Sequence, residues 1–157
     1  MVVRRVLLGI VAALLAGGPA SAGLAAQERD AEYRKASDGT RILESQTGTE
    51  IRVLVEPSNL GGDEVAVAEI TFPAGTDARE GHLHEAVEIF YVLSGTLEHV
   101  VNGEVHRIEP GMVGIVRPGD PVIHRVPGDE PVRAVVIWGT GTEVERIAPF
   151  FQERPGG

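Results

Sequence analysis

The clearest pattern along the chain is a series of short apolar runs separated by turn residues. The runs have the length and composition typical of β-strands, and no long segment with a helical period competes with them. They cover residues 51–55, 65–72, 87–93, 97–101, 105–108, 112–116, 122–126 and 132–138. Eight short strands at this spacing predict an all-β fold, either an antiparallel sandwich or a small barrel.

One of the turns is a strong hairpin signal. Asn102-Gly103 suits a two-residue type I′ turn, because that turn needs a positive φ at both positions. In such a hairpin His99 lies opposite His106 on the neighbouring strand. Two placements of this pair are open. It lies either inside the barrel, where it would line a pocket or transfer protons, or on the outer surface or a dimer interface, which we favour.

The first 22 residues have a different pattern, that of a signal peptide. Arg4 and Arg5 precede an apolar core at 6–16, and the Ala-Ser-Ala that ends at Ala22 forms a small-residue cleavage site. An apolar stretch this short does not cross about 30 Å of hydrocarbon, so an uncleaved anchor is the less favoured alternative. We predict cleavage before Gly23 and export to the periplasm or the medium, without stable membrane insertion. The pattern does not distinguish Sec from twin-arginine export.

Composition then narrows the chemistry. The chain has no cysteine, which excludes disulfides, thiolate metal ligands and thiol nucleophiles. Its 23 acidic residues outnumber 14 lysines and arginines, and the net charge is −9. Because such a surface repels phosphate backbones, we expect no nucleic-acid partner.

A compact group of candidate metal ligands lies near the middle of the chain. His82 and His84 are two residues apart, so on an extended backbone they point to the same side. Glu88 has the same parity and joins them after a short bend. Two imidazoles and a carboxylate on one face can bind a divalent metal ion and leave positions open for a substrate or O₂. An isolated histidine pair of this kind is more often a plain surface feature, so its surroundings decide.

Those surroundings resemble the cupin family. The first cupin motif, HxH–x3–E–x6–G, is matched at every fixed position from His82 to Gly95, and its opening glycine is displaced by one residue, at Gly75. The second motif is represented by two proline–glycine pairs followed by His124. The resemblance covers about residues 65–140.

The resemblance implies a fold and a ligand set. In the family the two motifs form hairpins of a jelly-roll barrel, and three histidines and one glutamate bind a metal ion in its mouth. Carried over to this sequence, the ligands are His82, His84, Glu88 and His124. We therefore expect a cupin barrel at 41–148, with an N-terminal arm at 23–40 and a C-terminal tail at 149–157.

The spacing before His124 departs from the family pattern. His124 follows Gly119 by five residues instead of three, so a gapless alignment puts Val122 at the ligand position. His124 would then lie roughly 6.6 Å further along the strand. Alternatively, the loop before His124 is two residues longer, which restores the register. We favour the longer loop, because loops accept insertions more readily than strands.

The resemblance leaves three classes of function open. The leading one is an oxidoreductase of the small dioxygenase type, in which iron or manganese binds O₂ and an organic substrate, with Glu88 as a ligand or as a catalytic base. The second is an isomerase, lyase or hydrolase that uses the ion, with zinc or nickel also possible, as a Lewis acid. The third is a non-catalytic module that binds a sugar or another small molecule.

Small cupins commonly form dimers, so we also expect a homodimer. A sheet with unpaired edge strands needs to cover them, and the segment 41–56 could supply such an edge strand.

Overall fold

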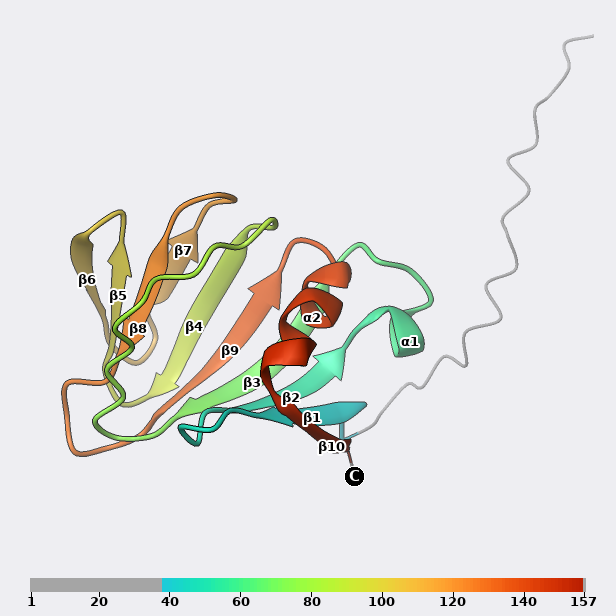
Figure 1. Cartoon of the computed structure of the whole chain (residues 1–157), viewed down its shortest axis with the longest axis horizontal. Helices are drawn as coiled ribbons and strands as arrows, with labels where there is room; N and C mark the ends of the chain where they lie inside the picture. The colour runs from blue at the N-terminus through green and yellow to red at the C-terminus, as the bar shows by residue number, and fades with distance from the viewer. Residues whose placement is uncertain (1–37, 157) are drawn as a thin grey trace, which may run out of the picture.

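The computed structural model describes residues 38–156. The predicted signal peptide at 1–22 and most of the predicted arm at 23–40 lie outside the described residues, so cleavage and export stay predictions. The described chain forms two antiparallel β-sheets with short helices at one side (Figure 1). None of the helices in this part of the chain is long and apolar enough to cross a membrane. The predicted all-β architecture is confirmed.

The eight predicted strands are all present, with ends within one residue of the predicted ones. They are β2 (Glu50–Val55), β3 (Ala66–Phe72), β4 (Glu88–Ser94), β5 (Leu97–Val101), β6 (Glu104–Ile108), β7 (Val113–Val116), β8 (Val122–Arg125) and β9 (Val132–Trp138). Two further strands, β1 (Arg41–Glu44) and β10 (Gln152–Pro155), were not among the predicted runs. The larger sheet has the order β10-β1-β2-β3-β9-β4-β7, and the smaller one has the order β6-β5-β8.

The core between the sheets follows from strict alternation along the central strands. In β3 every second residue from Ala66 to Phe72 is buried, and in β9 the same holds from Val132 to Trp138. Leu97 and Ile108 of the smaller sheet belong to the same buried cluster. Burial of these side chains is the main stabilising contribution to the fold.

The predicted hairpin between β5 and β6 is confirmed. Asn102 has a φ of 53° and Gly103 a φ of 83°, as a type I′ turn requires. His99 lies opposite His106 in the resulting strand pair.

The chain continues past β9 into a segment that packs back on the barrel. It contains α2 (Thr142–Ile147), η1 (Ala148–Phe150) and β10, and β10 pairs with β1. A further short helix, α1 (Pro57–Leu60), follows β2. Arg41 of β1 forms ion pairs with Glu145 of α2 and Glu153 of β10. Because β1 lies between β10 and β2, it does not provide the free edge expected of the segment 41–56.

An exposed apolar face lies on the outer side of β4 and β7. Tyr91 and Leu93 of β4 and Val113 and Ile115 of β7 are exposed, Ile115 to 61%. Contiguous apolar groups at a surface often mark interaction sites. The homodimer stays a prediction, and we expect its contact here. Wild-type protein should have the mass of a dimer in light scattering, and Ile115→Lys should reduce it to that of a monomer. Wild-type protein that is monomeric in dilute buffer would contradict the prediction.

Candidate metal centre

The loop between β3 and β4 carries two of the predicted ligands and runs beside β8 (Figure 1). His82 and Val122 exchange two backbone hydrogen bonds, each of 3.0 Å. The carbonyl oxygen of His84 accepts a hydrogen bond of 2.9 Å from the backbone N–H of Gly119. These contacts fix the loop at both histidines, and both side chains line the same cavity.

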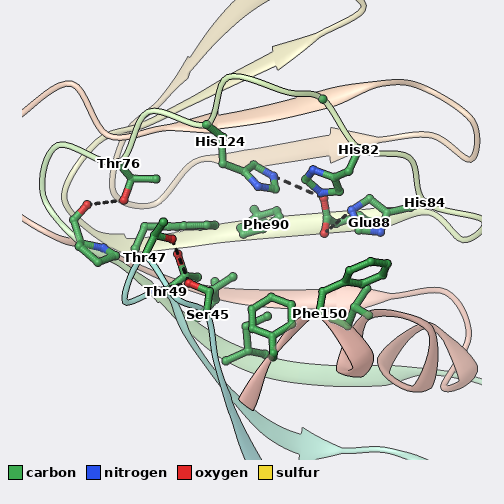
Figure 2. A pocket seen from close by; sticks show the side chains of 18 of the residues that line it. Ser45, Thr47, Thr49, Thr76, His82, His84, Glu88, Phe90, His124 and Phe150 are labelled. Atoms are coloured by element: carbon green, nitrogen blue, oxygen red, sulfur yellow. Dashed lines mark hydrogen bonds and ion pairs between the residues drawn. The ribbon is translucent and has the colours of Figure 1, made fainter. Parts of the chain in front are cut away.

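The four predicted ligands come together inside the barrel (Figure 2). Glu88 is the first residue of β4 and is 2% exposed. Its Oε1 lies 3.2 Å from Nε2 of His84, and its Oε2 lies 3.7 Å from Nε2 of His124. The ring centroid of His82 is 4.8 Å from that of His84 and 5.1 Å from that of His124. Residues far apart in sequence thus meet around one carboxylate.

His124 reaches the cluster from β8. Its ring contacts those of Phe72 and Phe90, with centroids 5.1 and 5.2 Å away. Val122, two residues earlier and also buried, pairs with His82 of the loop through its backbone. This placement supports the longer-loop alignment, in which His124 and not Val122 occupies the ligand position.

The donor atoms of this cluster fit a bound cation. Nε2 of His84, Oε2 of Glu88 and Nε2 of His124 are buried without a hydrogen-bond partner, although buried polar atoms are nearly always paired. Imidazole nitrogen and carboxylate oxygen are the donors that iron, manganese and zinc accept in proteins. The set therefore matches a divalent ion in its chemistry.

The spacing of these donors is slightly wider than that of a closed metal site. Two donors bound to one ion at about 2.1 Å lie roughly 3.0–3.4 Å apart. The 3.2 Å between His84 and Glu88 meets this condition, and the 3.7 Å between His124 and Glu88 has to shorten. Within residues 38–156 no three such side chains are already close enough to enclose an ion. Binding would thus draw His124 toward Glu88.

A second carboxylate, which the sequence analysis did not identify, contacts His84 at Nδ1, the ring nitrogen that faces away from Glu88. Oε1 of Glu143, on α2, lies 2.7 Å from Nδ1 of His84, and Glu143 is 1% exposed. Arg146 donates hydrogen bonds to the same carboxylate oxygen and to the carbonyl of Leu83. When Nδ1–H of His84 donates to Glu143, the lone pair of Nε2 points into the cluster. Carboxylates that hold a histidine in this way are common around protein-bound metals.

The electrostatics keep these groups in the forms that bind a cation. Burial by itself would raise the pKa of Glu88. The neighbouring His124, His84 and His82 have a larger effect in the opposite direction, and the pKa falls to about 2. The indole N–H of Trp138 also donates a 3.0 Å hydrogen bond to Glu88. Burial is the largest cause that lowers the pKa of His82, and the neighbouring histidines lower it as well, so that the pKa is about 4. At neutral pH the cluster therefore offers an anionic carboxylate and a neutral imidazole.

Glu143 is held in its anionic form as well. Burial raises the pKa of this carboxyl group, but the hydrogen bonds from Arg146 and His84 lower it more strongly.

His99 lies inside the barrel, and its favoured placement on the outer surface is wrong. It is 1% exposed, and its ring lies edge-on to Phe90 and beside His124. Both ring nitrogens are without a hydrogen-bond partner. His106 opposite it is exposed, because β6 is the edge strand of the smaller sheet. Burial is the largest cause that lowers the pKa of His99, and nearby His124 lowers it as well, so that the pKa is about 3.

Replacing His99 with leucine should stabilise the metal-free protein. Leucine has a similar volume and removes two unpaired buried nitrogens, which cost about 1–3 kcal/mol. The unfolded chain binds a proton at this histidine near pH 6.5, whereas the folded chain does so only near pH 3. The wild type therefore loses stability as the pH falls below 6.5, and this contribution is absent from His99→Leu. Thermal unfolding at pH 7 and pH 5 measures both effects.

Exposed His106 provides the matched control for this comparison. His106→Leu should change stability by less than about 0.5 kcal/mol at either pH. A lower stability of His99→Leu at pH 5 than that of the wild type would contradict the interpretation of His99 as an unpaired core residue.

A cavity of about 830 Å³ opens beside the cluster. His82, His84, Glu88 and His124 line one side of it, and side chains of the β1–β2 turn and of η1 line the other (Figure 2). Its volume is in the range of protein sites for small organic ligands.

Comparisons with known proteins agree with this architecture. The family described as Cupin domain matches residues 68–138. The cupin domain of Schizosaccharomyces pombe Cnp3 is 25% identical, with a TM-score of 0.54 over 66% of this chain and 72% of its own. A search of curated protein sequences found no match.

Two further solved structures share the fold at lower identity. An RmlC-like cupin from Shewanella frigidimarina has a TM-score of 0.57 and 16% identity, covering 73% of this chain and 95% of its own. A variant of Bacillus subtilis oxalate decarboxylase has a TM-score of 0.58 and 15% identity, covering 76% of this chain and 34% of its own.

Proposed function

Because this chain belongs to the cupins through its domain at residues 68–138, we propose that it is a metal-dependent oxidoreductase of the dioxygenase type that acts on a small organic molecule. The observation that carries the proposal is that His84, Glu88 and His124 each direct a buried nitrogen or oxygen atom without a hydrogen bond toward one another, beside a cavity of ligand size. The expected homodimer and the exported location accompany it as proposals.

The four clustered side chains would hold one divalent ion, with iron or manganese favoured. His82, His84 and His124 provide neutral nitrogens and Glu88 provides the anionic oxygen, so one positive charge of the ion is left for a substrate anion. When bound, the ion supplies a redox-active centre at which O₂ and the substrate can be held side by side. Glu88 suits the role of ligand better than that of base, because its two oxygens face Trp138, His84 and His124.

The lining of the cavity favours oxidation over proton transfer. Apart from the four candidate ligands, Asp77 and Arg146 are the ionisable side chains that line it within the described residues. Asp77 is exposed and paired with Arg125, and Arg146 is paired with Glu143. An isomerase or lyase needs an available proton acceptor near its substrate. A dioxygenase places both atoms of O₂ in its product and needs neither a protein base nor a separate reductant.

Metal content and oxygen uptake test the proposal together. Protein from the native host should contain iron or manganese near one ion per chain. Metal-free protein reloaded anaerobically with Fe²⁺ should then consume O₂ when offered a substrate from a panel of apolar compounds with two neighbouring oxygens. Zinc in the native protein with non-oxidative turnover would instead support the Lewis-acid class. The absence of metal would support a binding module.

A further inference from the structure

The cavity beside the metal centre has a lining that distinguishes between classes of ligand. We propose that it binds a small molecule with an apolar body, aromatic or branched, and one pair of oxygens directed at the ion, and that it does not bind a sugar. This inference rests on the proposed metal site, whereas the apolar half of the cavity can be tested without metal.

Apart from the four candidate ligands, the walls of the cavity are mainly apolar. Aliphatic and aromatic side chains from the larger sheet and from the C-terminal segment make up these walls: Ile51, Ile70, Phe72, Phe90, Ile147 and Phe150. An apolar ligand body that displaces water from such a surface gains free energy in proportion to the area buried.

Three of the four hydroxyl side chains that line the cavity in the described part of the chain, those of Ser45, Thr47 and Thr76, already form hydrogen bonds within the protein. Oγ of Ser45 contacts Oγ1 of Thr47 at 3.0 Å and accepts a hydrogen bond from the backbone N–H of Thr49. Oγ1 of Thr76 donates to the carbonyl of Pro73 at 2.7 Å (Figure 2). No asparagine, glutamine or lysine belongs to the described lining. A sugar would therefore bury several hydroxyl groups without partners, and each such group costs affinity.

Phe150 forms an exposed apolar wall of the cavity. It faces the cavity opposite the histidine cluster (Figure 2), and it is 80% exposed, although neighbouring Phe151 and Ile147 pack against the core. The segment that carries it is held by the pairing of β10 with β1 and by the ion pairs of Arg41. The ring is thus presented on a fixed support, where an apolar ligand body would shield it from water.

Two hydroxamates with the same metal-binding head test the ligand class. Acetohydroxamate carries a methyl group and benzohydroxamate a phenyl ring, so their difference in affinity for the zinc-loaded protein reports on the cavity walls alone. We expect benzohydroxamate to bind at least about tenfold more tightly by calorimetry. Phe150→Ser should remove most of this advantage and leave acetohydroxamate binding within twofold of the wild type. Val105→Ser, at an exposed apolar position outside the cavity and outside the expected dimer contact, should change neither affinity.

The remaining outcomes separate this inference from the proposed metal site. Equal affinities for the two hydroxamates, or tighter binding of glucuronate than of benzohydroxamate, would overturn the apolar ligand class and leave the metal site standing. Protein that takes up no ion would overturn the metal site. In that protein, binding of 1-naphthol that is lost in Phe150→Ser would still support an apolar cavity, and the absence of binding would overturn it.

Discussion

Converting His84 to alanine should yield a folded protein that no longer retains a stoichiometric metal ion. The substitution removes one of three imidazoles around Glu88, and two remaining histidines with one carboxylate lose much of the affinity of the full set. The fold should persist, because its stability comes from the apolar core between the two sheets and not from the ion. Elemental analysis after gel filtration and circular dichroism measure the two results.

The other ligands give a graded series around this result. His82→Ala and His124→Ala should lose the ion as fully as His84→Ala, and Glu88→Gln should weaken it by removing the anionic donor while keeping the volume. His106→Ala is the control, since this histidine is exposed and outside the cluster. Full metal content in His84→Ala would rule out the proposed site, and full content in His124→Ala alone would reduce it to two histidines and a carboxylate.

Glu143→Ala should weaken metal binding without removing a ligand. Glu143 accepts a hydrogen bond from Nδ1–H of His84 and thereby directs the lone pair of Nε2 into the cluster, where an ion would bind. Loss of such a supporting carboxylate typically costs about 10–100-fold in metal affinity. Glu143→Gln should lose less affinity, because an amide oxygen can still accept a hydrogen bond from Nδ1–H. Competition with a metal-binding dye gives the affinities.

A tautomer measurement separates this positioning role from a general loss of stability. In metal-free wild-type protein, nitrogen NMR should find a proton on Nδ1 of His84, and in Glu143→Ala that proton should move to Nε2, which then faces the one remaining carboxylate, Glu88, at 3.2 Å. Glu145→Gln is the control on the same helix, since the Glu145 side chain is 65% exposed. Unchanged metal affinity in Glu143→Ala would show that the 2.7 Å contact has no bearing on the ion.

The strands and the histidine cluster were predictable because their signals are local in sequence. Alternation in β3 and β9 marks the buried face directly, and Asn102-Gly103 fixes the hairpin through its backbone requirement. The HxH spacing places His82 and His84 on one side of an extended segment, which the two hydrogen bonds to Val122 maintain.

Glu143 and Phe150 were not predictable, because their roles depend on how a distant segment packs. Glu143 and Glu145 are the same residue type on one short helix, yet the first is buried against His84 and the second is exposed. Nothing in their immediate sequence distinguishes them. For His99 a signal existed, since it shares a strand face with buried Leu97. The sequence did not show that β6 is an edge strand, where His106 is exposed although its partner His99 is buried.

The pairing of β10 with β1 has a consequence for the order of events during synthesis. Arg41 pairs with Pro155, so a growing polypeptide that ends before β10 can assemble most of both sheets but lacks the strand that anchors α2. Contacts between such distant residues form late and slow the folding rate. Since α2 carries Glu143, a chain that ends before this segment should bind the ion only as weakly as Glu143→Ala does. Ribosome-bound intermediates arrested before residue 142 should accordingly show protease-resistant sheets and a metal affinity about 10–100-fold below that of the full chain.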